Sequence, residues 1–314
     1  MPYMNFSAVF PGQGSQSLGM MNDLSNHFPV VKETFDQASD ILGKNLWEIV
    51  SNGPDELLSQ TEITQPLMLA AGVATWRVWL SQEGPMPQAM AGHSLGEYSA
   101  LVASGAVDYA TAVALVGKRA SLMQQAVPEG VGGMAAILGL EAEQVIAGCA
   151  KAANGQVVEA VNFNSPEQTV IGGEAEAVDR AMAVLSEMGA KRTIKLAMSV
   201  PSHCCLLKDI SLQMAEALQA ADFSEPKINV FHNVSAKTCD GVDAIKAILA
   251  EQLYKPVRWV EIINALESCG SDTIIEFGPG KVLFGLNRRI NRKLGNLTIN
   301  DMASLEKALA AVKG

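Results

Sequence analysis

Apolar residues occur along the chain in two alternating patterns. Short continuous runs at 6–10, 88–91 and 273–277 predict strands. Apolar positions three or four residues apart predict helices at 30–42, 55–59, 66–81, 95–104, 108–126, 204–220, 243–253, 260–268, 282–290 and 303–312, with a further strand at 228–233. Pro66 is expected in the first turn of its helix, and Asp108 at an N-cap. The alternation predicts a larger α/β domain with a parallel sheet.

The pattern changes between about residues 131 and 197. The predicted order there is a strand at 134–138, a helix at 142–153, strands at 157–162 and 169–171 joined by a turn at 164–166, a helix at 175–188 and a strand at 192–197. This βαββαβ order is typical of a ferredoxin-like unit. Pro128-Glu129-Gly130 precedes it and Pro201 follows it. We therefore expect residues 128–200 to form a small subdomain inserted into a core made of residues 1–127 and 201–314.

Composition narrows the class of protein. Of the 314 residues, 48% are hydrophobic, enough for a large core, and the formal net charge of −10 argues against a general nucleic-acid binder. The five cysteines are scattered without the paired spacing of a metal site, as free thiols in a reducing compartment are. Residues 1–10 lack the features of a signal peptide, and the most apolar helix contains Arg77 and is too short to span a bilayer. We predict a soluble cytoplasmic protein without a metal.

The segment Gly92-His-Ser94-Leu-Gly96 has the Gly-x-Ser-x-Gly pattern of a nucleophile elbow. A serine hydroxyl is a poor nucleophile unless it is held exposed beside a base, with N–H donors ready for an oxyanion. A sharp strand-to-helix turn achieves this, and flanking glycines avoid a clash in it. The alternative is an ordinary glycine-rich turn. The loop at 11–16, after the first strand, is similarly either a plain turn or a cradle for an oxyanion or phosphate; it lacks the lysine of a P-loop.

Four histidines are candidates for the base. His27 lies in a surface-like turn and His232 in a predicted strand, where a core role is common. His93 adjoins Ser94, but neighbours on an extended strand point to opposite faces. His203 lies where the insertion joins the core, at a place where a cleft would form. His203 is therefore the candidate base.

A triad acid is harder to find. An elbow-type hydrolase orders its triad as serine, acid and histidine. The two aspartates between Ser94 and His203 are Asp108, which starts a helix, and Asp179, inside a helix of the small subdomain; no glutamate there stands out. The sequence thus indicates a Ser–His dyad oriented by something other than a carboxylate.

Six motifs occur in one order along the chain: Pro11-Gly-Gln-Gly-Ser-Gln16, Gly92-His-Ser-Leu-Gly-Glu97, Gly117-Lys-Arg119, Pro201-Ser-His203, Gln252-Leu-Tyr-Lys-Pro-Val257 and Gly278-Pro-Gly-Lys281. Together they resemble the malonyl-CoA:acyl carrier protein transacylases of fatty acid synthesis, over essentially the whole chain. The resemblance implies a hydrolase-like α/β core with a parallel sheet and an inserted ferredoxin-like subdomain.

The resemblance also implies roles for single residues. Ser94 would be the acylated nucleophile and His203 its base, with the main-chain carbonyl of Gln252 orienting the imidazole. The backbone N–H groups of Gln13 and Leu95 would form the oxyanion hole. Arg119 would bind the free carboxylate of the substrate, because a guanidinium makes two charge-assisted bonds to a carboxylate. A residue at the place of Ser202 helps related polyketide acyltransferases to choose between malonyl and methylmalonyl, and the serine here departs from their malonyl-type pattern.

The expected activity is ping-pong transfer of malonyl from coenzyme A to the phosphopantetheine thiol of an acyl carrier protein, by a monomer that needs no cofactor and binds neither nucleic acid nor membrane. The alternatives are a serine thioesterase or hydrolase built on the same elbow, and a non-catalytic module that binds acyl carriers.

Carrier-protein docking is expected at a basic stretch. Carrier proteins are strongly acidic, as the resemblance implies, and this chain is acidic too, so docking needs a concentrated positive patch. The densest basic stretch consists of Lys281, Arg288, Arg289, Arg292 and Lys293, with no acidic residue between them. Lys191, Arg192 and Lys195 are candidates to flank the same cleft. The alternative is a solvated basic helix.

Overall fold

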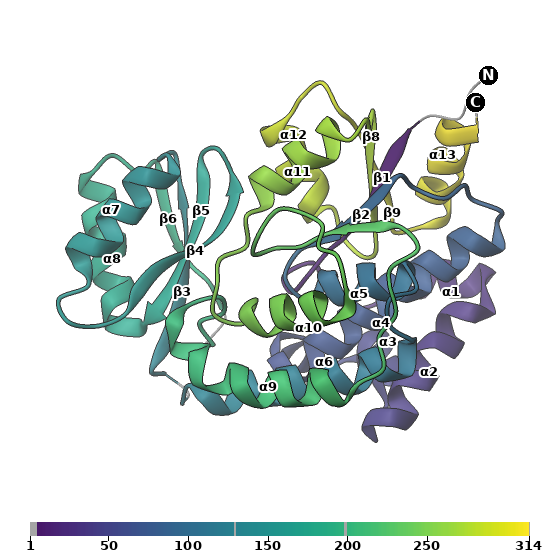
Figure 1. The fold of residues 1–314 in the computed structure, drawn as a ribbon, viewed down its shortest axis with the longest axis horizontal. Helices are drawn as coiled ribbons and strands as arrows, with labels where there is room; N and C mark the ends of the chain where they lie inside the picture. The colour runs from purple at the N-terminus through teal and green to yellow at the C-terminus, as the bar shows by residue number, and fades with distance from the viewer. Residues whose placement is uncertain (1–4, 129, 198–199, 314) are drawn as a thin grey trace.

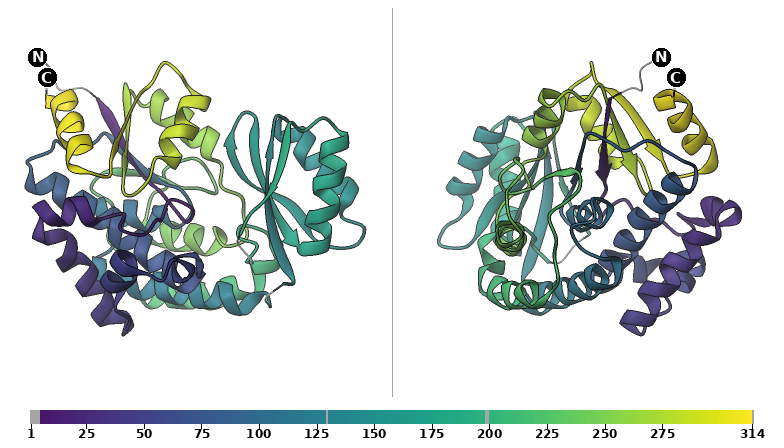
Figure 2. Two further views of the ribbon diagram at one scale, coloured as in Figure 1. Left: turned by 180° about the vertical axis from the view of Figure 1, so that it is seen from behind. Right: turned by 45° about the vertical axis from the view of Figure 1, so that its right-hand side comes forward.

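The computed structural model describes residues 5–128, 130–197 and 200–313. Residues 1–4 of the predicted start and Glu129 of the predicted subdomain boundary lie outside them. The described chain forms two units, each built on its own sheet, as Figures 1 and 2 show.

The larger unit contains a parallel five-stranded sheet in the order β7-β2-β1-β8-β9. Its strands are β1 (Phe6–Phe10), β2 (Ala89–Gly92), β7 (Asn229–Phe231), β8 (Thr273–Phe277) and β9 (Gly295–Ile299). The predicted α/β class with a parallel sheet is confirmed. Strand β9 was not predicted, because its Gly295-Asn-Leu-Thr-Ile299 sequence lacks a continuous apolar run.

Helices cover both faces of this sheet (Figure 1). On β1, Ala8 and Phe10 pack in the core that contains α4 (Thr61–Ser81), α5 (Gly96–Ala103) and α6 (Tyr109–Ala126). Val9, between them, packs on the other face with α11 (Trp259–Ser268) and α12 (Val282–Ile290). Because side chains alternate along a strand and both faces are covered, the central strands are apolar throughout. Parallel strands also direct their carboxyl ends to one edge of the sheet, where sites usually form.

The remaining helical segments of the larger unit are α1 (Asn22–His27), α2 (Pro29–Leu42), α3 (Leu46–Asn52), the 3-10 turns η1 (Asp55–Ser59) and η2 (Cys205–Leu207), α9 (Lys208–Ala220), α10 (Val242–Glu251) and α13 (Met302–Lys313). The short helices α1 and α3 were not predicted. The placement of Pro66 in the first turn was wrong, since α4 begins at Thr61. Burial of Ile63 and Thr64 extends that helix by a turn, which offsets the hydrogen bond that Pro66 lacks. Within the described ranges, no helix combines the length and apolarity that a membrane crossing requires.

The smaller unit has the predicted βαββαβ order. It consists of β3 (Gly132–Leu138), α7 (Ala142–Ala152), β4 (Val158–Ser165), β5 (Gln168–Glu174), α8 (Ala175–Glu187) and β6 (Arg192–Lys195). The sheet is antiparallel, in the order β4-β5-β3-β6, which confirms the ferredoxin-like class. The turn predicted at 164–166 was early: Ser165 still pairs with Gln168, so the hairpin turns at 166–167. The outer limits of the insertion, 128 and 200, stay a prediction.

A short β-bridge joins the two units. Val257, in the segment between α10 and α11, donates its N–H to Val161 O at 2.9 Å and accepts from Phe163 N at 2.9 Å. The segment between α10 and α11 therefore connects the core to β4, the edge strand of the small sheet.

Candidate active site

Ser94 lies in a sharp turn between β2 and α5. Its φ angle is 51°, in the left-handed region. A Cβ on Gly92 would lie 1.9 Å from the carbonyl carbon of Gly96, and one on Gly96 would lie 2.1 Å from Phe10 O. Only glycine fits at either position, so the local sequence matches this strand–turn–helix geometry.

His203 faces the serine from the segment that follows the small unit. The Nε2 atom of its buried ring lies 2.7 Å from Ser94 Oγ, and Nδ1 lies 2.7 Å from the main-chain oxygen of Gln252. A carbonyl oxygen only accepts, so Nδ1 carries the proton and Nε2 presents a lone pair to the Ser94 hydroxyl. The structure thus brings together the three residues of the predicted dyad and its orienting carbonyl.

The surroundings of His203 favour its neutral form. Burial lowers its pKa, and the positive charge of Arg119 lowers it further, to about 3, against the opposing effect of the hydrogen bond to Gln252. The imidazole is therefore uncharged near neutral pH. A neutral imidazole hydrogen-bonded to a hydroxyl is the arrangement that a general base requires.

Two backbone N–H groups are available for an oxyanion. Gln13, in the loop after β1, and Leu95, directly after the serine, both line the cleft that contains Ser94. Neither N–H donates to another group among the residues described. A Cβ on Gly12 would lie 2.5 Å from His93 O, so the loop after β1 packs directly against the elbow. The two N–H groups are therefore candidates for the oxyanion hole.

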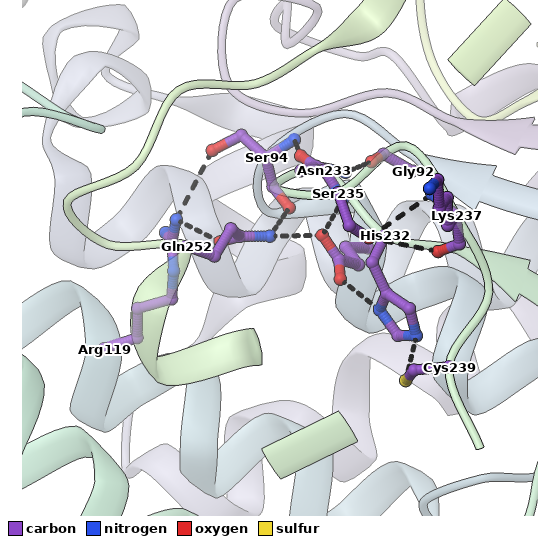
Figure 3. Close-up of polar contacts among 10 residues, drawn as sticks. Gly92, Ser94, Arg119, His232, Asn233, Ser235, Lys237, Cys239 and Gln252 are labelled. Atoms are coloured by element: carbon purple, nitrogen blue, oxygen red, sulfur yellow. Dashed lines mark hydrogen bonds and ion pairs between the residues drawn. The ribbon is translucent and has the colours of Figure 1, made fainter. Parts of the chain in front are cut away.

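Arg119 projects from α6 toward the Ser94 hydroxyl. Its guanidinium is 1% exposed and donates to Gln65 Oε1, to Gln252 Oε1 at 3.0 Å and to Ser94 Oγ at 3.3 Å (Figure 3 shows the last two partners). All three acceptors are uncharged, and its Nε has no hydrogen-bond partner within the described chain. Burial lowers the pKa of Arg119. A buried cation without a direct anionic partner is a binding point for an anion.

The nucleophile opens into a cleft between the two units. The cavity has a volume of about 190 Å³ and is bounded by the elbow, the loop after β1, α12 and the small sheet. Most of its surface is apolar, and polar residues such as Asn162 and Asn164 line it as well. The apolar side chains include Met123, Met134, Ala136, Val170, Leu196, Leu283 and Leu286. Ser202 also lines it, beside His203. The cleft therefore offers an apolar channel that ends at a serine, a neutral base and a cation.

The other histidines and the rejected aspartates have partners other than the Ser94 hydroxyl, although His93 also lines the cleft. His93 bonds Asn164 Oδ1 at 2.7 Å, and His27 bonds Asp23 O. Asp108 caps α6 as predicted, and Asp179 pairs with Lys195. No carboxylate hydrogen-bonds to His203 among the residues described, and that part of the chain contains no group of three or more potential metal ligands.

The basic residues of the predicted docking stretch are all exposed. Lys281, Arg288 and Arg289 border or belong to α12, whose inner side lines the cleft, and Arg292 and Lys293 follow it. Arg289 donates to Gln168 of β5 at 2.7 Å, and Gln168 lines the cleft. The candidate flanking residues differ, because Lys191 and Lys195 each pair with a carboxylate of the small unit.

Three polar residues near the serine were not predicted. Gln65 accepts a hydrogen bond from Arg119, the Asn233 side chain accepts one from Ser94 N, and Glu97 is completely buried. A single charge in the otherwise small and apolar segment Gly96–Ala103 was a signal that could have indicated Glu97. No local pattern marks Gln65 or Asn233, since their partners lie more than 50 residues away.

Comparisons with known proteins agree on one family. The acyl transferase domain matches residues 8–298. The malonyl CoA-acyl carrier protein transacylase of Haemophilus influenzae is 51% identical over 300 residues, 95% of this chain and 96% of that protein. A solved transacylase of the same name from Coxiella burnetii is 44% identical with a TM-score of 0.98, covering 99% of both chains. A further structure, titled as a type II PKS acyl-carrier protein in complex with its malonyl-transacylase, is 50% identical with a TM-score of 0.96, covering 98% of this chain and 99% of that one.

Proposed function

The chain belongs to the acyl transferase domain family, and from this premise we propose that it transfers malonyl from malonyl-CoA to the phosphopantetheine thiol of an acyl carrier protein. The relatives that share about half of its residues are malonyl CoA-acyl carrier protein transacylases. They support this activity over the thioesterase and over a non-catalytic carrier-binding module. The resulting malonyl thioester serves fatty acid synthesis in the cytoplasm.

The first half-reaction forms an acyl-enzyme. His203 Nε2 takes the proton of Ser94 as Oγ attacks the thioester carbonyl. The N–H groups of Gln13 and Leu95 stabilise the oxyanion, and the Nδ1–H bond to Gln252 holds the imidazolium that forms. As the intermediate collapses, the C–S bond breaks and His203 returns the proton to the CoA sulfur. Malonyl remains on Ser94 as an ester.

The second half-reaction reverses these steps with a different thiol. His203 takes the proton of the phosphopantetheine thiol, the sulfur attacks the Ser94 ester, and the same two N–H groups stabilise the second oxyanion. The bond to Ser94 Oγ then breaks and the serine regains its proton from His203. Acid and base are both supplied by one imidazole, so a monomer completes the cycle without metal or cofactor.

The observation that carries this proposal is the position of Arg119 beside the nucleophile. Its Nη2 lies 3.3 Å from Ser94 Oγ, at the buried end of an apolar cleft. A malonyl group has its free carboxylate two carbons from the reacting carbonyl, so an acyl group on Ser94 places that carboxylate within reach of the guanidinium. A plain hydrolase has no need of a buried cation there.

The test is a mass spectrum after exposure to malonyl-CoA. We expect a malonyl adduct on the peptide that contains Ser94, absent from Ser94→Ala, that persists in water and is discharged by a carrier-protein thiol. Cys204 and Cys205 adjoin His203 and are the rival nucleophiles; burial raises the pKa of Cys204 to about 12, against that role. An adduct on either cysteine would refute the dyad, and rapid hydrolysis without a thiol would indicate a thioesterase.

A further inference from the structure

A buried carboxylate lies directly behind the nucleophile, outside the reacting atoms. Glu97, in the first turn of α5, is 0% exposed. Its Oε1 accepts from His232 Nδ1 at 2.7 Å, and its Oε2 accepts from Asn233 N at 3.1 Å and from Gln252 Nε2 at 2.7 Å. One side chain thus joins three segments that are far apart in the sequence: the elbow helix, the segment after β7 and the end of α10.

Gln252 transmits the position of this carboxylate to the catalytic groups. Its main-chain oxygen accepts from His203 Nδ1, and its side-chain Nε2 donates to Ser94 O at 3.0 Å as well as to Glu97. Its Oε1 accepts from Arg119 (Figure 3). A displacement of Gln252 would therefore move the base and the cation together.

Asn233 connects Glu97 to the elbow that carries Ser94. The Asn233 side chain accepts from Ser94 N at 2.6 Å and donates to Gly92 O at 2.6 Å, so one amide spans the strained turn (Figure 3). Its own backbone N–H is held by Glu97. The strained φ of Ser94 persists only if its surroundings hold it, and this amide is part of what holds it.

The carboxylate has one direct cationic partner among the described residues, His232. The side chains of Glu97 and His232 are both almost fully buried, and His232 Nε2 lies 3.0 Å from Cys239 Sγ. Burial lowers the pKa of His232, but the hydrogen bonds to Cys239 and Glu97 and the negative charge of Glu97 outweigh it and raise the pKa to about 9. The ring is therefore charged near neutral pH and balances the buried carboxylate.

We propose that Glu97 is a positioning residue for the transfer reaction and His232 its counter-ion: the carboxylate fixes Gln252 and Asn233, and through them His203 and the elbow of Ser94. This inference rests on the proposed function. Malonylation of the unmodified enzyme tests that function separately, so failure of one is distinguishable from failure of the other.

The primary variant is Glu97→Gln, which keeps the shape of the side chain. A glutamine offers one acceptor oxygen and an NH2 group to the three donors that surround Glu97, so at least one of them loses its partner. Because misplacement of catalytic groups by about 1 Å costs about 100-fold in rate, we expect acylation by malonyl-CoA to slow by about 100-fold. A serine-directed fluorophosphonate carries no carboxylate and so needs no contact with Arg119. It still depends on Ser94, His203 and the oxyanion hole, and its labelling of Ser94 should slow to a similar extent.

The matched control is Glu276→Gln. Glu276 of β8 is 1% exposed and accepts from the backbone N–H groups of Leu283 and Phe284. Burial raises its pKa to about 7, so in an assay above that pH the variant also removes a buried carboxylate charge. We expect the rate at which Ser94 is labelled in this variant to lie within about 2-fold of the rate in the unmodified enzyme. Such a change is well below the loss of about 100-fold expected from misplaced catalytic groups. If Glu97→Gln also labels at the control rate while folded, by its free energy of unfolding, the proposal is overturned.

A double-mutant cycle tests the coupling. His232→Gln alone should slow labelling, and it carries the test if Glu97→Gln does not fold. If the two residues act as one unit, the double variant should be no slower than the slower single variant. If the rate loss of the double variant equals the product of the two single losses, His232 does not act through Glu97. An unchanged labelling rate in His232→Gln would have the same meaning.

Discussion

Replacement of Arg119 by alanine should convert a malonyl-selective enzyme into one that no longer favours a carboxylate. The guanidinium is buried and donates to three neutral oxygens, with Nε free among the described residues. A malonyl carboxylate would be the anion that this cation otherwise lacks. Arg119→Ala removes that partner and leaves the carboxylate at the end of an apolar cleft.

The size of the effect follows from the number of bonds. Hydrogen bonds to charged groups contribute about 1.5–3 kcal/mol each. A planar guanidinium binds a carboxylate through two of them, so the variant loses about 3–6 kcal/mol. At about 1.4 kcal/mol per factor of ten, kcat/KM for malonyl-CoA should fall about 100- to 10,000-fold relative to acetyl-CoA.

The measurement is the ratio of kcat/KM for malonyl-CoA to that for acetyl-CoA. Arg119 also contacts Gln252, which orients His203, so the variant disturbs the dyad as well. That disturbance lowers both rates and cancels in the ratio. Arg119→Lys is the matched variant: it keeps the charge but lacks the planar fork, and its ratio should fall between the other two. An unchanged ratio in a folded Arg119→Ala enzyme would refute the reasoning, because another group would then bind the carboxylate.

Three further outcomes are expected. Burial and the nearby cation hold the pKa of His203 at about 3, so the acylation rate should show no inflection near pH 6.5, and such an inflection would contradict this reasoning. The free energy of unfolding should fall as the pH drops from 6.5 toward 3, because only the unfolded state takes up the proton in that range. Charge reversal at Arg288 and Arg289 should raise KM for the carrier protein and flatten its salt dependence. Charge reversal at the exposed Lys44, which follows α2, should change neither quantity. Equal rate losses in both half-reactions would place the docking site elsewhere. Gly96→Ala puts a Cβ 2.1 Å from a β1 carbonyl oxygen and should lower the free energy of unfolding by about 3 kcal/mol in a denaturant titration, and a value near zero would show that the elbow adapts.

Much of this protein follows from local sequence signals. The continuous apolar runs predicted the central strands, and the change of rhythm near residue 131 predicted the ferredoxin-like unit. The glycines around Ser94 predicted the elbow, because backbone atoms approach so closely in such a turn that they leave no room for a Cβ. These are properties of a few neighbouring residues, so they are readable before the chain folds.

Other features depend on residues that meet only in the folded chain. A helix pattern at 95–104 did not reveal that α5 is enclosed on all sides, so Glu97 passed for an ordinary helix glutamate. The orienting group of His203 is a backbone carbonyl, which every residue has and which therefore leaves no mark in the sequence. The start of the helix that contains Pro66 was placed too late, and the edge strand β9 was missed. Packing against the rest of the fold, rather than local propensity, decides where such a helix begins and whether such a short strand forms. Whether a charge is buried, which partner it meets and what pKa results are set by contacts across more than 100 residues, such as that of Glu97 with His232, and only the tertiary structure supplies those contacts.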